Sequence, residues 1–193
     1  MNDLKATRPG GRSARIQQSV HNTVRNLIET QGRESLNVPL IAQAAGVTPS
    51  TIYRRWGDLA QLLSDVALER MQPDAAPVST GSLRGDLEVW IEGYIEEMTS
   101  DVGRTILRDI LSSPKIENAD ACANYMRQQF DIMLERAAER GEEVPSSDAL
   151  INHLFAPIVY RLLFASSPPN LAFARELIDE MMVTGKSCEP SNS

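Results

Sequence analysis

Helix-boundary residues between positions 37 and 58 restrict the fold of this chain more than any other feature of its sequence. Asn37 can cap a helix because its side chain accepts hydrogen bonds from free backbone amides. Pro39 then falls in the first turn, where a missing N–H is tolerated. Gly46 ends this helix, which is therefore short. Its small apolar face consists of Ile41, Ala42 and Ala45.

A second short helix is predicted directly after this glycine turn. Thr48 is placed to cap it, and Pro49 occupies its first position, where proline is favoured. Gly57 ends the helix. The residues DLAQ at 58–61 resemble a capping box, which predicts a fourth and longer helix ending near Met71.

Apolar residues recur at helical spacing along almost the whole chain, and no stretch alternates as a strand would. The predicted fold class is therefore all-α, with about nine helices. The other helices are expected at residues 13–31, 83–98, 102–111, 118–140, 147–165 and 170–184. Residues 72–82 contain two prolines, a glycine and small polar residues, and they are the best candidate linker.

Charge is divided unevenly along the 193 residues. Residues 1–56 contain eight Lys or Arg against three Asp or Glu, a net charge of +5, whereas the remainder carries −12. A basic N-terminal part on an acidic protein suggests that this part meets a polyanion. An uneven surface without a function would show the same charges.

Membrane and secretory classes are not favoured by the sequence. The run from Leu154 to Ala165 is interrupted by Arg161, and it is shorter than the roughly 20 apolar residues that span a bilayer. The N-terminus lacks the apolar stretch of a signal peptide. Cys122 and Cys188 are the only cysteines, so we expect a cytoplasmic protein without a disulfide framework.

Two short helices joined by a glycine turn, with longer helices on either side, form a helix-turn-helix arrangement. In that arrangement the second short helix enters the major groove of DNA. Ile52 and Trp56 share the apolar face of this helix, and hydroxyl and guanidinium groups that suit phosphates and base edges cover the rest. An ordinary capped helix would explain any one of these residues, but not their joint spacing.

Residues 14–62 resemble the DNA-binding domain of the TetR family of transcriptional regulators. The resemblance rests on the sequence NVPLIAQAAGVTPSTIYRRWGDLAQLL at 37–63 and closely covers about a quarter of the chain. The remainder agrees in the number, length and order of helices. Two positions depart from the family pattern: Trp56 stands where Phe is usual, and Leu59 stands where a phosphate-contacting Lys is common.

The resemblance implies a set of DNA-contacting residues: Arg15, Asn37, Thr48, Pro49, Ser50, Thr51, Tyr53, Arg54 and Arg55. Asn37 would meet phosphate, and Tyr53 would touch the sugar-phosphate backbone. Arg12 and Arg15 would add phosphate or minor-groove contacts together with the arm before them. Arg55 fits a phosphate contact and a solvated surface position equally well.

The resemblance also implies a homodimer, with two recognition helices about 34 Å apart on a near-palindromic operator. The last two long helices would join the subunits through Leu150, Leu154, Ile158, Arg161, Leu162, Leu177, Ile178 and Met181. These positions could instead line the core of one chain. Pro157 predicts a bend, and Arg161 could meet an anion or the other subunit, although a partner within its own chain or solvent is favoured.

A small-molecule effector would bind among the first three helices after the linker. The candidate lining is Trp90, Tyr94, Met98, Ile106, Ile110, Tyr125, Met126, Phe130 and Met133. Such aromatic and thioether groups suit apolar ligands, but most of these positions individually fit an ordinary core. The sequence therefore indicates no particular ligand.

The expected domains are a flexible basic arm at 1–12, a helix-turn-helix domain with its connecting helix at 13–71, and a linker at 72–82. A helical ligand-binding and dimerisation domain at 83–185 and a disordered tail at 186–193 follow.

Motifs for nucleophilic catalysis, phosphate binding or zinc hydrolysis are absent, and neither histidine lies near a cysteine at metal-ligand spacing. We therefore expect no enzyme activity, no cofactor and no metal. The favoured function is a DNA-binding repressor released by a small molecule. The alternatives are a helix-turn-helix protein without ligand sensing, and a helical protein whose basic part binds another polyanion, such as RNA or an acidic protein.

Overall fold

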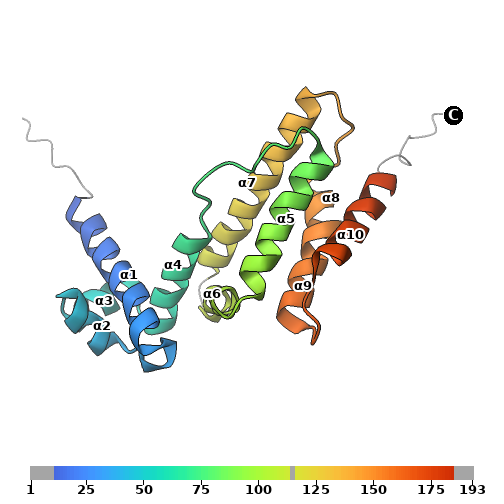
Figure 1. The fold of residues 1–193 in the computed structure, drawn as a ribbon. Helices are drawn as coiled ribbons and strands as arrows, with labels where there is room; N and C mark the ends of the chain where they lie inside the picture. The colour runs from blue at the N-terminus through green and yellow to red at the C-terminus, as the bar shows by residue number, and fades with distance from the viewer. Residues whose placement is uncertain (1–10, 114–115, 185–193) are drawn as a thin grey trace, which may run out of the picture.

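The computed structural model describes residues 11–113 and 116–184, and this part of the chain is all-α, as predicted (Figure 1). The helices are α1 (Gly11–Gln31), α2 (Val38–Ala45), α3 (Pro49–Trp56), α4 (Leu59–Met71), α5 (Leu83–Thr99), α6 (Asp101–Ser112), α7 (Glu117–Glu139), α8 (Ser147–Leu150), α9 (Ala156–Phe164) and α10 (Leu171–Thr184). A 3-10 turn at Arg33–Ser35 precedes α2. Of the expected arm at 1–12, residues 1–10 lie outside the described residues, as does the expected tail at 186–193. Residues 11 and 12 belong to α1, which begins at Gly11, two residues earlier than predicted.

The segment between α8 and α9 is a short π-helix, Ile151–Phe155, so α8, this segment and α9 run on as one long helix from 147 to 164. Counted in this way, the described residues form the nine helices that the sequence predicts. The π-helix ends two residues before Pro157, which has no N–H to donate to the carbonyl of His153. A wider helical turn therefore lies directly before this proline, and the predicted bend stays a prediction.

Local capping residues set the boundaries of the short helices. The side chain of Asn37 accepts a hydrogen bond from the amide of Leu40 at 2.9 Å, and Gly46 ends α2 with a φ of 67°, in the left-handed region. Asp58 caps α4 by accepting from the amide of Gln61 at 2.8 Å. These contacts confirm the predicted caps because each one satisfies a backbone amide that has no partner within its helix.

Thr48 departs from the predicted pattern. It occupies the N-cap position of α3, but its hydroxyl makes no capping hydrogen bond to the backbone. That hydroxyl instead lies 2.9 Å from the hydroxyls of both Ser50 and Thr51. The predicted side-chain cap is therefore wrong, and the three hydroxyls form a small cluster at the start of the helix.

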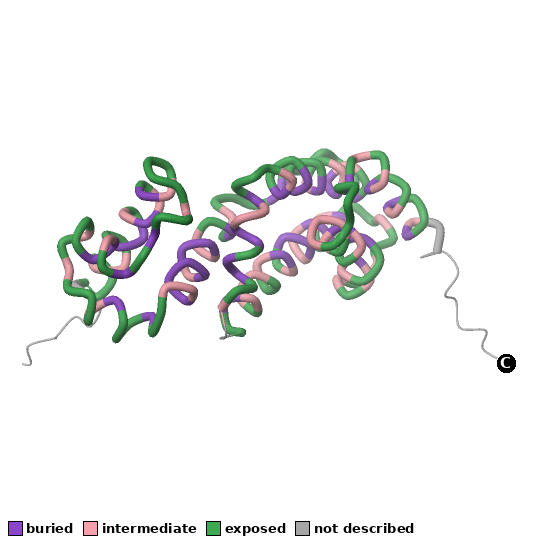
Figure 2. Tube along the Cα trace, turned by 90° about the horizontal axis from the view of Figure 1, so that it is seen from below, coloured by how far each residue is buried: buried purple, intermediate pink, exposed green. Residues whose placement is uncertain are grey.

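Two hydrophobic cores share helix α4. The first lies among α1, α2, α3 and α4, and α1–α3 are here called the N-terminal unit. The second lies among α4 to α10, and α5–α10 are here called the bundle. Leu62, Leu63 and Val66 of α4 belong to the first core, whereas Ala67 and Met71 belong to the second. Figure 2 shows buried positions along the facing sides of the helices in both parts. Because α4 contributes side chains to both cores, it connects the N-terminal unit to the bundle.

Helix α6 forms a second connection between the N-terminal unit and the bundle. Arg33, after α1, donates from Nε to the Oδ1 atom of Asp109 at 2.9 Å, and its Nη2 atom donates to the same oxygen. Asp109 is buried, so this ion pair satisfies a carboxylate that solvent barely reaches. Ser64 of α4 also donates to the carbonyl of Ile110 at 3.3 Å and accepts from Asn118 at 3.0 Å. The N-terminal unit and α4 are thus tied to α6 by polar contacts as well as by apolar packing.

Candidate nucleic-acid interface

Helix α3 presents one apolar face to the protein and leaves the rest of its surface open. Ile52 is fully buried and Trp56 is 4% exposed, which confirms that these two residues anchor the helix. Eight of the nine residues predicted to contact DNA are exposed, and Thr51 is half-buried. The arrangement leaves hydroxyl, phenol and guanidinium groups accessible on a helix that is held from behind.

The N-terminal end of α3 brings short polar groups together. The hydroxyls of Thr48, Ser50 and Thr51 form the cluster described above, and Pro49 lies between them on the exposed surface. Tyr53 follows with half of its surface exposed. Hydroxyls can both donate and accept hydrogen bonds, so this end of the helix suits both phosphate oxygens and base edges.

The two arginines of α3 have different environments. Arg55 donates to the carbonyl and hydroxyl of Ser13 at 3.0 and 2.7 Å and to Gln17 at 2.7 Å, and its guanidinium lies 5.3 Å from the ring of Trp56. Arg54 is exposed and has no hydrogen-bond or ion-pair partner within residues 11–113 and 116–184. Arg55 therefore ties α3 to α1, whereas the guanidinium of Arg54 remains available.

Two further predicted residues lie on neighbouring helices. Arg15 is exposed on α1, two residues after the Ser13 that Arg55 contacts. Asn37 is exposed at the start of α2, where its side chain caps the helix. The side chain of Arg12 lies outside the described side chains. The exposed candidates thus come from α1, from the start of α2 and from α3.

Sequence reasoning missed a polar cluster behind α3, here called the His21 cluster: the buried His21 and Trp56 and the half-buried Asp65 and Glu69. The indole N–H of Trp56 donates to Asp65 at 2.8 Å. The Nε2 atom of His21 lies 3.1 Å from the same carboxylate, and its Nδ1 atom lies 2.5 Å from Glu69. Ionised carboxylates only accept hydrogen bonds, so this arrangement favours the form of His21 that has protons on both ring nitrogens and a positive charge.

The electrostatics of the His21 cluster agree with this assignment. Burial disfavours the charged form of His21, but its hydrogen bonds to Asp65 and Glu69, with their negative charges, outweigh burial and raise its pKa above the ordinary value. Burial disfavours the charged form of Asp65 as well, yet hydrogen bonds from His21 and Trp56 lower its pKa. The pKa of Glu69 is also lowered, since hydrogen bonds from His21 and Gln18 outweigh its burial. Each charge in the cluster is stabilised by its neighbours.

Both departures from the family pattern have structural consequences in this region. Trp56, at the usual Phe position, adds an indole N–H that finds Asp65, so it contributes a hydrogen bond as well as size. Leu59, at the usual Lys position, is half-buried against the core of the N-terminal unit. A charge pattern along α4 could have indicated the cluster, since Asp65 and Glu69 are four residues apart on one helical face.

Four of the nine predicted effector-pocket residues line one cavity. Trp90, Tyr94, Met98 and Met126 border a space of about 300 Å³ that also touches residues 70–74 at the end of α4. Ile106 lines a different cavity, between α1, α4 and α6. The remaining candidates, Ile110, Tyr125, Phe130 and Met133, are packed in or against the core of the bundle.

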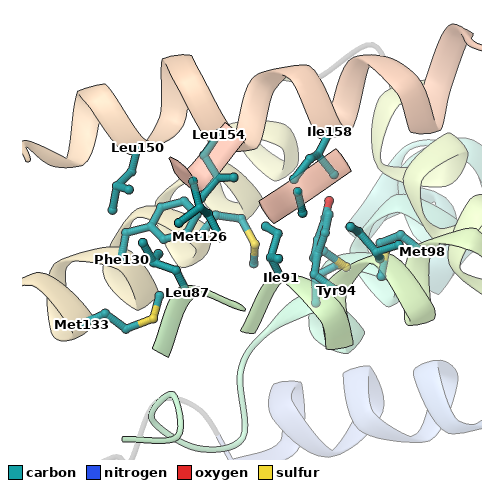
Figure 3. Close-up of a cluster of buried hydrophobic side chains, with 14 of the residues drawn as sticks. Leu87, Ile91, Tyr94, Met98, Met126, Phe130, Met133, Leu150, Leu154 and Ile158 are labelled. Carbon is teal, nitrogen blue, oxygen red and sulfur yellow. The ribbon is translucent and has the colours of Figure 1, made fainter. Parts of the chain in front are cut away.

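Most of the predicted subunit-interface residues lie inside one chain. Leu150, Leu154 and Ile158 are fully buried and point toward α5 and α7 (Figure 3), and Ile178 and Met181 are buried as well. This burial agrees with the alternative that these five side chains line the core of one chain, and a role for them between subunits stays a prediction.

The other three interface candidates keep some exposed surface. Leu162, Leu177 and Arg161 are half-buried. The guanidinium of Arg161 lies 3.6 Å from the ring centre of Phe173, so Arg161 has an aromatic partner within its own chain. Among the described residues, no group of three or more His, Cys, Asp or Glu side chains could hold a metal ion.

Comparisons with known proteins agree with this geometry. Residues 77–181 match the family model described as "Tetracyclin repressor-like, C-terminal domain", and residues 23–66 match "Bacterial regulatory proteins, tetR family". The second match covers α2, α3, the C-terminal part of α1 and most of α4, and it includes every exposed candidate residue except Arg15. No helix in the described part of the chain has the length and apolar character to cross a membrane.

Individual relatives are similar over most of their length. An HTH-type transcriptional regulator of Mycobacterium tuberculosis is 25% identical over 185 residues, which cover 93% of this chain and 91% of that protein. The DNA-binding transcriptional repressor TetR of Mycobacteroides abscessus is 26% identical over 161 residues, covering 79% of this chain and 84% of that protein. The crystal structure of the TetR family transcription regulator SCO0332 has the same fold, with a TM-score of 0.65 and 22% identity over 87% of this chain and 97% of that chain.

The His21 cluster makes the stability of the protein depend on pH. Because folding raises the pKa of His21, its contribution is complete below the ordinary value of 6.5 and is lost as pH rises through the raised value. Asp65 and Glu69 have lowered pKa values, so their contributions are lost only in acid. We expect His21→Gln to lower the free energy of unfolding by about 1–2 kcal/mol near pH 6. The variant should also lack the decrease in stability that deprotonation of His21 causes above pH 6.5.

Urea unfolding across a pH series checks this expectation. His153 is exposed, so His153→Gln is the matched control and should retain the pH dependence of the unmodified protein. A pH dependence that survives His21→Gln would show that another group is responsible.

Proposed function

The chain belongs to the TetR family of DNA-binding transcriptional regulators, and we propose that it is a repressor that a small-molecule effector releases from a near-palindromic operator. The observation that carries the proposal is the exposed face of α3. It offers Tyr53 and an Arg54 that has no partner among the described residues, while Ile52 and Trp56 anchor the helix to the core. The relative from Mycobacteroides abscessus that is named a repressor supports the direction of regulation.

DNA recognition is assigned to the exposed face of α3. The hydroxyls of Ser50 and Thr51 and the guanidinium of Arg54 would meet base edges or phosphates in the major groove. Tyr53 would contact the sugar-phosphate backbone. Arg55 would act from behind, because its hydrogen bonds to α1 fix the angle at which α3 leaves the protein surface. Asn37 and Arg15 would add phosphate contacts on either side of the recognition helix.

A homodimer is proposed through the outer faces of α9 and α10. Tyr160 and Phe164 are 64% and 73% exposed on α9, and their ring centres are 5.5 Å apart. Two adjacent exposed aromatic side chains are unusual on a protein that remains a monomer, and they suit a subunit interface. Leu162 and Leu177 would lie beside this pair. A twofold axis there would place two copies of α3 in successive major grooves of an operator.

Effector sensing is assigned to the cavity bordered by Trp90, Tyr94, Met98 and Met126. The rings of Trp90 and Tyr94 are stacked, with centres 5.5 Å apart, and the two methionines can adjust to apolar parts of a ligand. Arg70, Asp74, Glu97 and Gln129 line the same cavity, so it suits a ligand that has polar groups as well. Met71, the last residue of α4, borders the same cavity. A ligand held there would contact the end of α4, the helix that supports α3. If the ligand binds one position of α4 more tightly than another, it would shift the protein toward that position.

The proposed domains are a helix-turn-helix unit with its connecting helix at residues 13–71 and a ligand-binding and dimerisation unit at 83–185, joined by the linker at 72–82. The two hydrophobic cores that meet at α4 support this division.

The DNA contacts predict that Tyr53→Ala and Arg54→Ala each weaken binding to the operator by about 1–3 kcal/mol while the helix content of the protein is unchanged. Fluorescence anisotropy with a duplex from upstream of the protein's own gene measures the affinity. Arg108→Ala removes the same charge from an exposed position on α6 and serves as the control. Unchanged affinity in both α3 variants would remove the assignment.

The effector site predicts that an apolar compound which releases the operator does so less effectively after Trp90→Leu. DNA affinity without the compound should be unchanged, because Trp90 lies in the bundle, outside the N-terminal unit. A mobility-shift titration over a panel of hydrophobic compounds measures both quantities. Val89→Ala changes the exposed neighbour of Trp90 and provides the control. Operator binding that no compound alters would refute the sensing part of the proposal.

The subunit interface predicts that Tyr160→Glu and Phe164→Glu convert a dimer into a monomer, since each variant would bury a charge between the subunits. Sedimentation velocity at several protein concentrations measures the change. Leu111→Glu alters a side chain that is 59% exposed on α6, and it should leave the dimer intact. A dimer that survives both aromatic substitutions would place the interface elsewhere.

A further inference from the structure

A second cavity lies where the N-terminal unit meets the bundle, between α1, α4 and α6. Its volume is about 340 Å³, within the range of small-molecule sites in proteins. We propose that this junction cavity binds a small molecule with an aliphatic chain and a carboxylate. This inference does not depend on the proposed function, because ligand binding can be measured without DNA.

The walls of the junction cavity favour an aliphatic ligand. Its apolar lining consists of Ile28, Leu63, Val66, Ala67, Val102 and Ile106. None of the cavity's lining residues is aromatic, in contrast to the cavity beside Trp90 and Tyr94. An alkyl chain that packs against these aliphatic walls removes apolar surface from water, which favours binding, and no aromatic ring is needed for this contact.

Most charged groups around the junction cavity already have partners. Arg33 is paired with Asp109, and the Nη1 atom of Arg25 lies 3.1 Å from Glu69. On α6, Asp101 is paired with Arg104, with 2.6 Å between its Oδ1 atom and the Nη2 atom of the arginine. These pairs leave little net charge for a ligand to recognise.

Two charged side chains that line the cavity have no hydrogen-bond or ion-pair partner among the described residues: Glu29, and Arg70, which also borders the cavity beside Trp90. Arg70 follows Val66 and Ala67 by one helical turn, so its side chain lies at the end of the aliphatic wall that α4 provides. Glu29 is exposed on α1, and Arg25, one turn before it, is paired with Glu69. A ligand carboxylate beside Arg70 therefore has a cation to pair with.

The position of the junction cavity gives such a ligand a mechanical role. Ile28 belongs to α1, Val66 to α4 and Val102 to α6, so one ligand would contact both the N-terminal unit and the bundle. The ion pair between Arg33 and Asp109 forms part of the same wall. A bound ligand would thus hold together two parts that the protein otherwise joins through α4 and this ion pair.

The test uses the full chain and three probes with the same alkyl chain: decanoate, decanol and decylamine. Isothermal titration calorimetry should show decanoate binding most tightly and decylamine most weakly. Arg70→Gln should weaken decanoate binding about tenfold and leave decanol unchanged, because only the carboxylate pairs with the guanidinium. Val102→Asp should weaken decanoate binding by about tenfold or more, since it places a negative charge on the cavity wall.

The variants are chosen so that the fold is retained. Val102 is 51% exposed in the first turn of α6, where an acidic residue is compatible with the helix dipole. Leu111→Asp introduces the same charge at an exposed position of α6 that does not line the cavity, and it should bind decanoate normally. Trp90→Leu should also bind decanoate normally, because Trp90 lines only the other cavity.

Three results would overturn the inference. One is the absence of decanoate binding at concentrations below its critical micelle concentration. The second is unchanged decanoate binding in Val102→Asp, and the third is a loss caused by Trp90→Leu in place of Val102→Asp, which would locate the ligand in the cavity beside Tyr94. None of these results depends on operator binding, so the proposed function is judged separately.

Discussion

The carboxylate of Asp65 is the interaction on which the DNA-binding surface depends. It accepts hydrogen bonds from Trp56 at the end of α3 and from His21 in the middle of α1. Since Asp65 itself belongs to α4, one side chain fixes three helices relative to one another. Removing a partner from such a group is costly because a half-buried carboxylate then loses a hydrogen bond, so the cluster adds to the apolar packing that holds α3. The exposed face of α3 can therefore be polar without making the helix mobile.

Helix α4 connects the His21 cluster to the rest of the protein. Its first half belongs to the core beneath α3 and its second half to the core of the bundle. The two cavities described above border α4, one at its end near Met71 and one along the side that contains Val66. Any ligand that favours one position of α4 would consequently change the position of Asp65, and with it the angle of α3. In this architecture a shift of α4 alone would be enough for a ligand to change DNA binding.

The sequence predicted those features that neighbouring residues determine. Asn37, Gly46 and Asp58 cap helices through hydrogen bonds with backbone groups a few positions away. Because these contacts are local, the helix boundaries agree within about two residues with those predicted. Contacts between distant segments were not predictable in this way. The pairing of Arg33 with Asp109 joins residues 76 positions apart, and nothing local marks either one as a partner. The burial of Leu150 and Ile158 inside one chain likewise depends on how α5 and α7 pack, which apolar spacing alone does not define.

The most direct test of this account is the selection of binding sites from a pool of random DNA duplexes, carried out with the unmodified protein at low and at moderate salt. The account predicts one enriched, near-palindromic motif whose half-sites are separated by about one helical turn, roughly 34 Å, and which persists at moderate salt. It predicts this spacing because two copies of α3 must reach adjacent major grooves. Binding without an enriched motif, falling equally for all sequences as salt rises, would contradict the account and indicate a nonspecific polyanion-binding surface.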